Sequence, residues 1–308
     1  MKKSILILLI ALIPMLMIVS CSKDDDSESN FEMLVNYMDS NGMEIGDLLS
    51  SGWIVGADST LHANMDNYYF MDMRADSVFA TGHIPGAVNT SLGTLLEDAD
   101  DVEKPIIMVC YTGQGAGHAV MALRLSGYMD ARVLKWGMSG WNGDFDSWSG
   151  NVAQLDHANW KATPGEIMAS ANFDMPDLDT NGDTGAEILA ERVDAMLAAG
   201  FKGIAGVDVL DRPGDYFVNN FWTAADVETY GNISGAYRIN PIVLENLDPD
   251  AELVTYCWTG QTSSMITAYL NILGYNAKSL KFGANSMIYD ALTVHKWGGS
   301  ADWDYVTE

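Results

Sequence analysis

The chain has 308 residues, enough for two domains of ordinary size, and 48% of them are hydrophobic, so a substantial core is available. Its formal net charge is -26, with 42 acidic residues against 16 basic ones. This balance argues against nucleic acid as a partner, because phosphate binding needs clustered Lys and Arg. It also disfavours docking on anionic lipid through surface charge.

Residues 1–20 have the composition of a secretory signal, with two lysines, an apolar run and then Ser20. The run is too short and too poorly flanked for a membrane-spanning helix. The stretch Ile18-Val19-Ser20-Cys21 resembles a bacterial lipobox. That resemblance implies cleavage before Cys21 and lipidation of its sulfur, and several acyl chains would give firm membrane anchoring. An ordinary signal peptide with an incidental cysteine is the alternative.

The segment 21–30 is polar and acidic and is typical of a disordered tether. An acidic cluster after a lipidated cysteine resembles the export tag of some surface lipoproteins. We therefore expect an exported protein that is lipid-anchored to the cell envelope, at the outer membrane, with surface exposure as a further option.

Apolar segments alternate with helical patterns in both halves of the remaining chain. In the first half we expect strands at 68–73, 105–110 and 132–136, and helices at 92–98 and 116–126. In the second half we expect strands at 203–209, 253–257 and 278–282, and helices at 186–199, 263–273 and 286–292. Strands alternating with helices predict an α/β fold in which a mainly parallel sheet is covered on both faces.

The two halves repeat each other around a cysteine. "CYTGQGAGHAVMALRLSGY" begins at Cys110, and "CWTGQTSSMITAYLNILGY" begins at Cys257. We interpret this as a tandem duplication. The predicted division is a first domain at 31–160, a linker at 161–184 and a second domain at 185–308.

Each of these cysteines is predicted to end a strand, with a loop of small residues and then a helix after it. Active sites of parallel sheets lie at the carboxyl ends of the strands. Backbone N–H groups and the helix N-terminus should stabilise an anion there and lower the thiol pKa. Gly113 and Gly260 suit the positive φ of a tight loop, and Thr112 and Thr259 could add hydroxyl donors.

The first half resembles a rhodanese domain. "FMDMRADSVFATGHIPGAVN" is similar to the N-terminal signature of that family, "IIMVCYTGQG" to its active-site strand and loop, and "VLKWGMSGW" to its closing region. The resemblance covers most of residues 60–145. The second half is less similar, because Leu210 stands where the first has Arg74, and Asn232 and Ser234 replace His83 and Pro85.

This resemblance implies a sulfurtransferase with two tandem rhodanese-like domains, in which a cysteine carries sulfane sulfur as a persulfide. It assigns Cys110 and Cys257 as nucleophiles. The sulfur-binding backbone would be that of Tyr111, Thr112, Gly113, Gln114, Gly115, Trp258, Thr259, Gly260, Gln261 and Thr262. No cofactor or metal is implied, and the partners are a small sulfur donor and acceptor or another protein.

Both loops lack the Lys or Arg that thiosulfate-using rhodaneses usually carry, so a dianionic donor would be held poorly. Arg74, Lys135 and Lys281 could supply some positive charge. Polysulfide, a persulfide or a protein is the alternative donor. A non-catalytic module that binds sulfur species, anions or a partner, and a redox accessory lipoprotein, are the alternative functions.

Single features of the sequence allow further interpretations. Cys110 and Cys257 could form a disulfide if the two sites face each other, although two separate thiols are favoured. Residues 177–187 resemble the start of a calcium loop but lack the bidentate Glu at its twelfth position, so a solvated linker is favoured. His83 is expected to bond to the backbone rather than act as a base, and His118 has Met265 as its counterpart.

Overall fold

The computed structural model describes residues 28–50, 52–163, 167–169 and 171–308. The predicted signal at 1–20, Cys21 and most of the predicted tether lie outside these residues. Asn30, the last residue of that tether, instead begins helix α1 (Asn30–Ser40), which Ser29 caps by accepting the Glu32 N–H. Within the described ranges, no helix is long and apolar enough to cross a membrane.

A five-stranded parallel sheet with the strand order β1-β5-β4-β2-β3 forms the first half. Its strands are β1 (Ile54–Val55), β2 (Tyr69–Asp72), β3 (Val88–Asn89), β4 (Ile106–Val109) and β5 (Arg132–Leu134). Every residue of β4 is buried, which accounts for its unbroken apolar sequence. The helices are α2 (Ile45–Leu48), α3 (Ser59–Ala63), α4 (Asp76–Phe79), α5 (Leu95–Asp98), α6 (Gln114–Leu125), α7 (Met138–Trp141) and the short 3-10 helices η1 (Met65–Asn67) and η2 (Gly143–Phe145).

A four-stranded parallel sheet with the order β7-β11-β10-β8 forms the second half, and this order parallels β1-β5-β4-β2. Its strands are β7 (Gly203–Ile204), β8 (Phe217–Asn220), β10 (Leu253–Tyr256) and β11 (Ala277–Leu280). The helices are α8 (Gly185–Ala199), α9 (Gly206–Asp211), α10 (Ala224–Tyr230), α11 (Gln261–Ile272) and the 3-10 helices η3 (Pro213–Asp215), η4 (Leu244–Asn246), η5 (Gly283–Ser286) and η6 (Tyr289–Ala291). The predicted α/β fold class, with parallel sheets flanked by helices, is confirmed.

Strand register corrects one sequence correspondence. Asp72 is the last residue of β2 and pairs with Val109, the residue before Cys110. Asn220 is the last residue of β8 and pairs with Tyr256, the residue before Cys257. The counterpart of Arg74, two residues after Asp72, is therefore Trp222. The similarity of short segments had paired Leu210 with Arg74, but Leu210 lies in α9, which precedes strand β8.

Several elements also differ in extent from the sequence expectations. The strand expected at 203–209 stops at Ile204, and α9 follows it. The helix expected at 286–292 is replaced by the short helices η5 and η6. The helices after the two cysteine loops begin earlier, at Gln114 and Gln261, because the loops contain only three residues after each cysteine.

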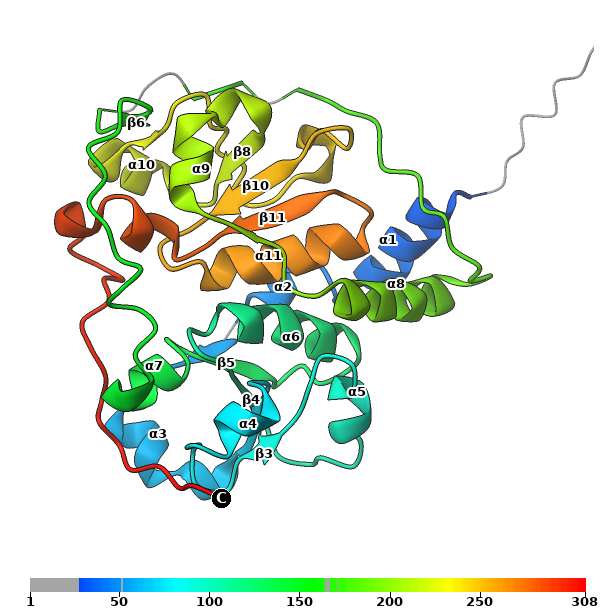
Figure 1. The fold of residues 1–308 in the computed structure, drawn as a ribbon. Helices are drawn as coiled ribbons and strands as arrows, with labels where there is room; N and C mark the ends of the chain where they lie inside the picture. Colours follow the sequence, from blue (N-terminus) through cyan, green and yellow to red (C-terminus); the bar gives the residue numbers. More distant parts are fainter. Residues whose placement is uncertain (1–27, 51, 164–166, 170) are drawn as a thin grey trace, which may run out of the picture.

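Helices α6 and α11 lie next to each other between the two sheets, and α1 and α8 extend this layer at one end (Figure 1). The largest core cluster is built from this layer, from β4 of the first sheet and from β10 and β11 of the second. Separate apolar clusters cover the outer faces of the two sheets. The two halves therefore share one central core.

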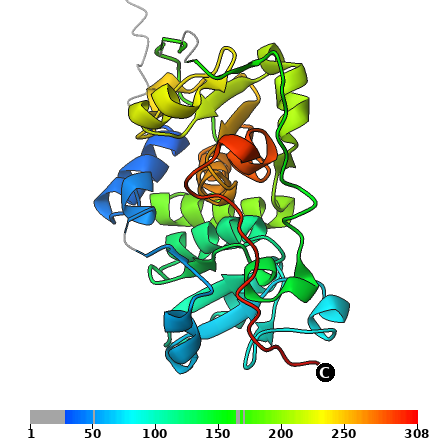
Figure 2. The same cartoon turned by 90° about the vertical axis from the view of Figure 1, so that its left-hand side faces the viewer.

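Segments near the predicted boundaries contact the opposite half. Strand β6 (Trp160–Lys161) follows the first half but pairs antiparallel with β9 (Asn232–Ile233) of the second. The C-terminal segment after Trp297 runs back over the first half (Figure 2), where Trp303 donates to Ala57 O and Val306 pairs with His83. The domain boundaries at 160 and 185 stay predictions, since these contacts cross them.

The close contact between α6 and α11 yields a stability prediction. A Cβ at Gly117 would lie 3.0 Å from Gln261 O and 3.1 Å from Ser264 Oγ, in the middle of the shared core. Gly117→Leu should lower the free energy of unfolding by about 3 kcal/mol, because the two helices cannot move apart without losing core contacts. Urea unfolding measures this.

The matched control is Gly46→Leu on α2, where nothing lies within 4 Å of the added Cβ. That variant should unfold near the wild-type midpoint. Equal destabilisation by the two substitutions would contradict the role assigned to the α6–α11 contact.

Candidate thiol site

Cys110 follows the last residue of β4, and its sulfur lies at the N-terminus of α6. Sγ accepts the N–H of Gly113 at 3.1 Å and that of Ala116 at 3.3 Å. Gly113 has φ +84°, a conformation that other residues rarely adopt and that turns the chain from the loop into α6. The predicted arrangement of strand, cysteine, tight loop and helix is confirmed, and it places positive dipoles around one sulfur atom.

The carbonyl groups of the loop point away from the sulfur, toward the start of α7. Cys110 O accepts the Met138 N–H at 2.8 Å, and Tyr111 O accepts the Ser139 hydroxyl at 2.7 Å. Gly137 has φ +62°, and a Cβ there would collide with Cys110 O. The N–H of Gly113 shares a peptide with Thr112 O, which accepts from Trp148 Nε1 at 3.2 Å and Gln261 Nε2 at 3.1 Å, so these contacts keep that N–H turned toward the sulfur.

The Cys257 loop repeats this geometry. Its Sγ accepts the N–H of Gly260 at 3.2 Å and that of Ser263 at 3.4 Å. Gly260 has φ +78°, and Cys257 O accepts the N–H of Ala284 at 3.0 Å. Two cradles with the same pattern of donors therefore lie at the carboxyl ends of two parallel sheets.

The expected fall in thiol pKa is not found at Cys110. Burial raises the pKa of this thiol above its ordinary value and is the largest influence. The N–H groups of Ala116, Thr112 and Gly113 lower the pKa, while the carboxylate of Asp72 raises it. Cys110 is only 7% exposed, and with its pKa raised the resting group is a thiol rather than a thiolate.

The side chains of Gln114 and Gln261, whose backbone was assigned to the sulfur cradle, point to the opposite half instead of to the sulfurs. Gln114 reaches the other half, where its Oε1 accepts the Phe282 N–H at 2.7 Å. Gln261 reaches the first half, where its Nε2 donates to Thr112 O at 3.1 Å. Both glutamines are buried. Each loop thus holds the other in place across the interface between the halves.

The threonine hydroxyls are also occupied elsewhere. Thr112 Oγ1 accepts from Gln114 Nε2 at 3.1 Å, and Thr259 Oγ1 donates to Gln261 Oε1 at 3.1 Å. They position the two glutamines and do not supply the donors to sulfur that the sequence suggested. Gly115 lies beside the sulfur, since a Cβ there would be 3.8 Å from Cys110 Sγ.

Arg74, one of three residues expected to lend positive charge, is buried and paired. It forms a 2.6 Å ion pair with Asp72 and donates to Gly82 O at 2.6 Å. Its guanidinium carbon lies 5.9 Å from the centre of the Tyr111 ring. Arg74 therefore supports the loop through Tyr111, while Asp72 offsets its charge.

Lys135 and Lys281 make no side-chain hydrogen bond or ion pair within the described ranges. The Lys135 ammonium lies 5.0 Å from the Trp136 ring centre, and burial lowers the pKa of Lys135. Lys281 lines a hollow of about 200 Å³ with Phe282 and Ser286. Neither contact places the ammonium at a cysteine.

The entrances of the two cradles differ. Tyr111, after Cys110, is 42% exposed. Trp258, after Cys257, stacks on Trp222 with ring centres 4.1 Å apart and lies 5.5 Å from His295. Cys257 itself is only 2% exposed. Trp258 can stack on Trp222 because Trp222 occupies, in the second half, the position that Arg74 has in the first half.

The disulfide, the calcium loop and the role of His83 can each be compared with the structure. Cys110 and Cys257 are separate free thiols. His83 Nδ1 lies 3.0 Å from Phe79 O, as expected for a structural histidine. In the calcium-like segment, Thr184 and Glu187 cap α8 together, and among the described residues no cluster of three metal-ligating side chains occurs.

Sequence reasoning missed three contributors. Ala116 and Ser263 donate to the sulfurs, but the predicted helix starts placed them after the loop. A helix start placed directly after each glycine of positive φ would have put Ala116 and Ser263 in the first helical turn and so identified them as donors. Asp72, whose charge acts on Cys110, lies far from the cysteine in sequence, and only strand pairing brings it close.

Fold and site together define a parallel α/β protein with a buried thiol that accepts backbone N–H groups at the start of a helix. The Rhodanese-like domain family matches residues 58–144. Thiosulfate sulfurtransferase GlpE of Shewanella oneidensis is 32% identical over 74 residues, which are 23% of this chain and 73% of that protein. The chain therefore belongs to the rhodanese family.

Other similar proteins include one without a described activity. Uncharacterized protein YibN of Escherichia coli is 29% identical over 99 residues, 30% of this chain and 67% of that protein. Among solved structures, the 3-mercaptopyruvate sulfotransferase SseA of Escherichia coli is 16% identical, with a TM-score of 0.28. That comparison covers 75% of this chain and 98% of the SseA chain.

The raised thiol pKa predicts how Cys110 responds to pH. Its alkylation by iodoacetamide should be slow at pH ~7 and keep rising above pH ~8.5, the ordinary thiol pKa, because only the thiolate reacts. Peptide mass spectrometry separates Cys110 from the other cysteines. A rate that reaches its plateau below pH ~7.5 would show a depressed pKa instead.

Proposed function

We propose that this protein is a sulfurtransferase that carries sulfane sulfur as a persulfide on Cys110. The observation that carries the proposal is the pair of N–H donors from Gly113 and Ala116 on the cysteine sulfur at the head of α6. Such donors stabilise negative charge on sulfur, as a persulfide cycle requires. Membership of the rhodanese family and the relative named thiosulfate sulfurtransferase support it.

The cycle has two displacements at sulfur. The Cys110 thiolate attacks the outer sulfur of the donor, a new S–S bond forms, and the old bond to that sulfur breaks with its electron pair leaving on the donor remnant. A nucleophilic acceptor then attacks the outer sulfur of the persulfide. The S–S bond breaks, and its electron pair returns to Cys110 as thiolate.

The charges around the site favour a donor with little negative charge. Neither loop contains Lys or Arg, the net charge is -26, and Asp72 offsets Arg74 beneath the loop. A dianion such as thiosulfate would meet repulsion from the surface, and the loops offer it no cationic side chain. We propose a low-molecular-weight persulfide or a persulfidated protein as the donor, and inorganic polysulfide, itself an anion, as a probe of sulfur loading.

We assign the principal activity to the first half. The family match lies there, and Cys110 is the more exposed of these two cysteines, at 7% against 2% for Cys257. Trp258 packs between Trp222 and His295 at the entrance of the second cradle. The second domain of the proposed tandem duplication would then serve mainly to hold the first loop through Gln261.

Sulfur loading tests this assignment. Wild-type protein incubated with polysulfide should gain one sulfur atom on the peptide that contains Cys110, seen by mass spectrometry after alkylation. Cys110→Ser should abolish that label, and the matched variant Cys257→Ser should retain most of it. Undiminished loading in Cys110→Ser, or loss only in Cys257→Ser, would refute the assignment.

One observation favours a second candidate function, a non-catalytic module that binds a sulfur species or a protein. Burial leaves Cys110 as a thiol with raised pKa, which slows nucleophilic attack. Turnover separates the two functions. A catalyst transfers sulfur from polysulfide to cyanide over many cycles, whereas a binding module gives at most one equivalent of thiocyanate per protein.

For the N-terminal segment we propose lipidation at Cys21 and anchoring to the cell envelope. The lipobox-like stretch before Cys21 and the acidic residues after it support this placement. Cys21→Ala should abolish incorporation of radiolabelled palmitate and release the protein from the membrane fraction. Unchanged labelling of that variant would contradict the proposal.

A further inference from the structure

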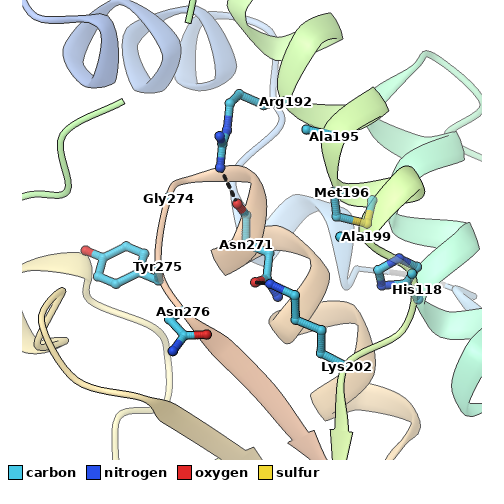
Figure 3. A pocket seen from close by; sticks show the side chains of 11 residues that line it. His118, Arg192, Ala195, Met196, Ala199, Lys202, Asn271, Gly274, Tyr275 and Asn276 are labelled. Carbon is cyan, nitrogen blue, oxygen red and sulfur yellow. Dashed lines mark hydrogen bonds between the residues drawn. The ribbon is translucent and has the colours of Figure 1, made fainter. Parts of the chain in front are cut away.

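A second concave site lies away from both cysteine loops. It is a pocket of about 260 Å³ between α8, the C-terminal end of α11 and α6 (Figure 3). Its walls include Arg192 on α8, Lys202 after α8, Asn271 on α11 and His118 on α6. Ligand pockets commonly start near ~300 Å³, so this volume suits a small ligand.

The charge of this pocket is opposite to that of the protein as a whole. Arg192, Lys202 and His118 line it, and none of the lining residues is Asp or Glu. The complete chain, by contrast, has 42 acidic residues and 16 basic ones. Two cations in one hollow without a carboxylate therefore form a local positive field that would attract an anion.

Both cations are held in place by the end of α11. Arg192 donates to Asn271 O at 2.7 Å and to Ile272 O at 2.9 Å, and Lys202 donates to Asn271 Oδ1 at 2.9 Å. In Figure 3 both side chains converge on Asn271. These contacts fix the positions of the cations in advance, which lowers the entropic cost of binding a ligand.

The contacts with α11 leave most of the positive charge uncompensated. A helix C-terminus carries only about half a negative charge, against the two full positive charges of Arg192 and Lys202. Neither residue takes part in an ion pair of the described residues. Glu191, beside Arg192, offsets part of this positive charge and acts to raise the pKa of Arg192, while burial, the larger influence, lowers it. Glu191 itself lies outside the pocket lining and accepts from Thr180 and Asn181. A structural role alone therefore leaves the charge unexplained.

His118 adds an unsatisfied polar group at the inner wall. It is 1% exposed, and neither ring nitrogen makes a hydrogen bond of normal geometry among the described residues. Burial lowers the pKa of His118 to about 4, with the backbone of Met196 raising it and Lys202 lowering it, so the ring is neutral at pH ~7. A buried polar ring without such partners is costly, and its counterpart in α11 is Met265.

We propose that this pocket binds a small oxyanion of the phosphate, sulfate or dicarboxylate class between Arg192 and Lys202. The guanidinium and ammonium groups would donate to the oxygens, and Asn276 would close the outer side. The site is separate from the cysteine loops, so it does not depend on sulfur transfer. The pocket would let this acidic protein bind an anion that the negative charge of its surface would otherwise repel.

Isothermal titration calorimetry of the full chain at low ionic strength tests the proposal with three probes: inorganic phosphate, sulfate and succinate. We expect saturable binding of at least one probe with one site per chain. Phosphate or sulfate alone would identify an inorganic oxyanion, and succinate would identify an organic dicarboxylate. Failure of all three to bind would overturn the proposal.

Three variants make the test specific to the pocket. Lys202→Met should weaken binding about tenfold by removing one charged donor. Lys161→Met removes the same charge from β6, where Lys161 also donates one hydrogen bond, and should leave affinity unchanged. Ala195→Phe fills the pocket from an exposed face of α8 without a change of charge, and should also weaken binding.

Thermal unfolding without ligand confirms that each variant is folded. Should Lys202→Met not fold, Ala195→Phe decides the question by itself. Equal losses in Lys161→Met and Lys202→Met would show general charge attraction rather than a site. Wild-type affinity in Ala195→Phe would place the anion elsewhere, and either result would refute the proposal.

Discussion

The reciprocal contact between the two cysteine loops is the constraint on which the rest of the structure depends. Gln114 Oε1 accepts the N–H of Phe282, which follows β11 in the second half. Gln261 Nε2 donates to Thr112 O in the loop of the first half. A Cβ at Gly113 or Gly260 would collide with the glutamine of the opposite half. Each sulfur cradle is therefore completed by the other half, so the working unit is the pair of halves rather than either sheet alone.

This arrangement explains why the cysteines are so deeply buried. Placing two loops against each other removes water from both, and burial then outweighs the N–H donors in setting the pKa of Cys110. The N–H of Gly113 is kept turned toward the sulfur because the carbonyl of the same peptide, Thr112 O, accepts from Gln261 and Trp148. The site is thus organised for negative charge on sulfur, while burial limits access to Cys110 and raises the pKa of its thiol.

Much of the fold followed from sequence pattern because local chemistry dictates it. The apolar run at 106–109 forms a buried parallel strand, and the glycine after Tyr111-Thr112 takes the positive φ that the loop needs. The placement of Leu210 opposite Arg74 was wrong because similarity of short segments does not set strand register. The side-chain partners of the two glutamines were not predicted, because nothing local distinguishes a side chain that faces the sulfur from one that faces the other half.

The sequence by itself determined the α/β class, the rhodanese resemblance and the position of each thiol at the start of a helix. These depend on periodicity, on glycine conformation and on residues within a few positions of each other. Tertiary structure alone decided the partners of Gln114, the closeness of Asp72 to Cys110 and the gathering of Arg192 and Lys202. Those features join residues far apart in the chain, and the packing of two sheets about α6 and α11 is what brings them together.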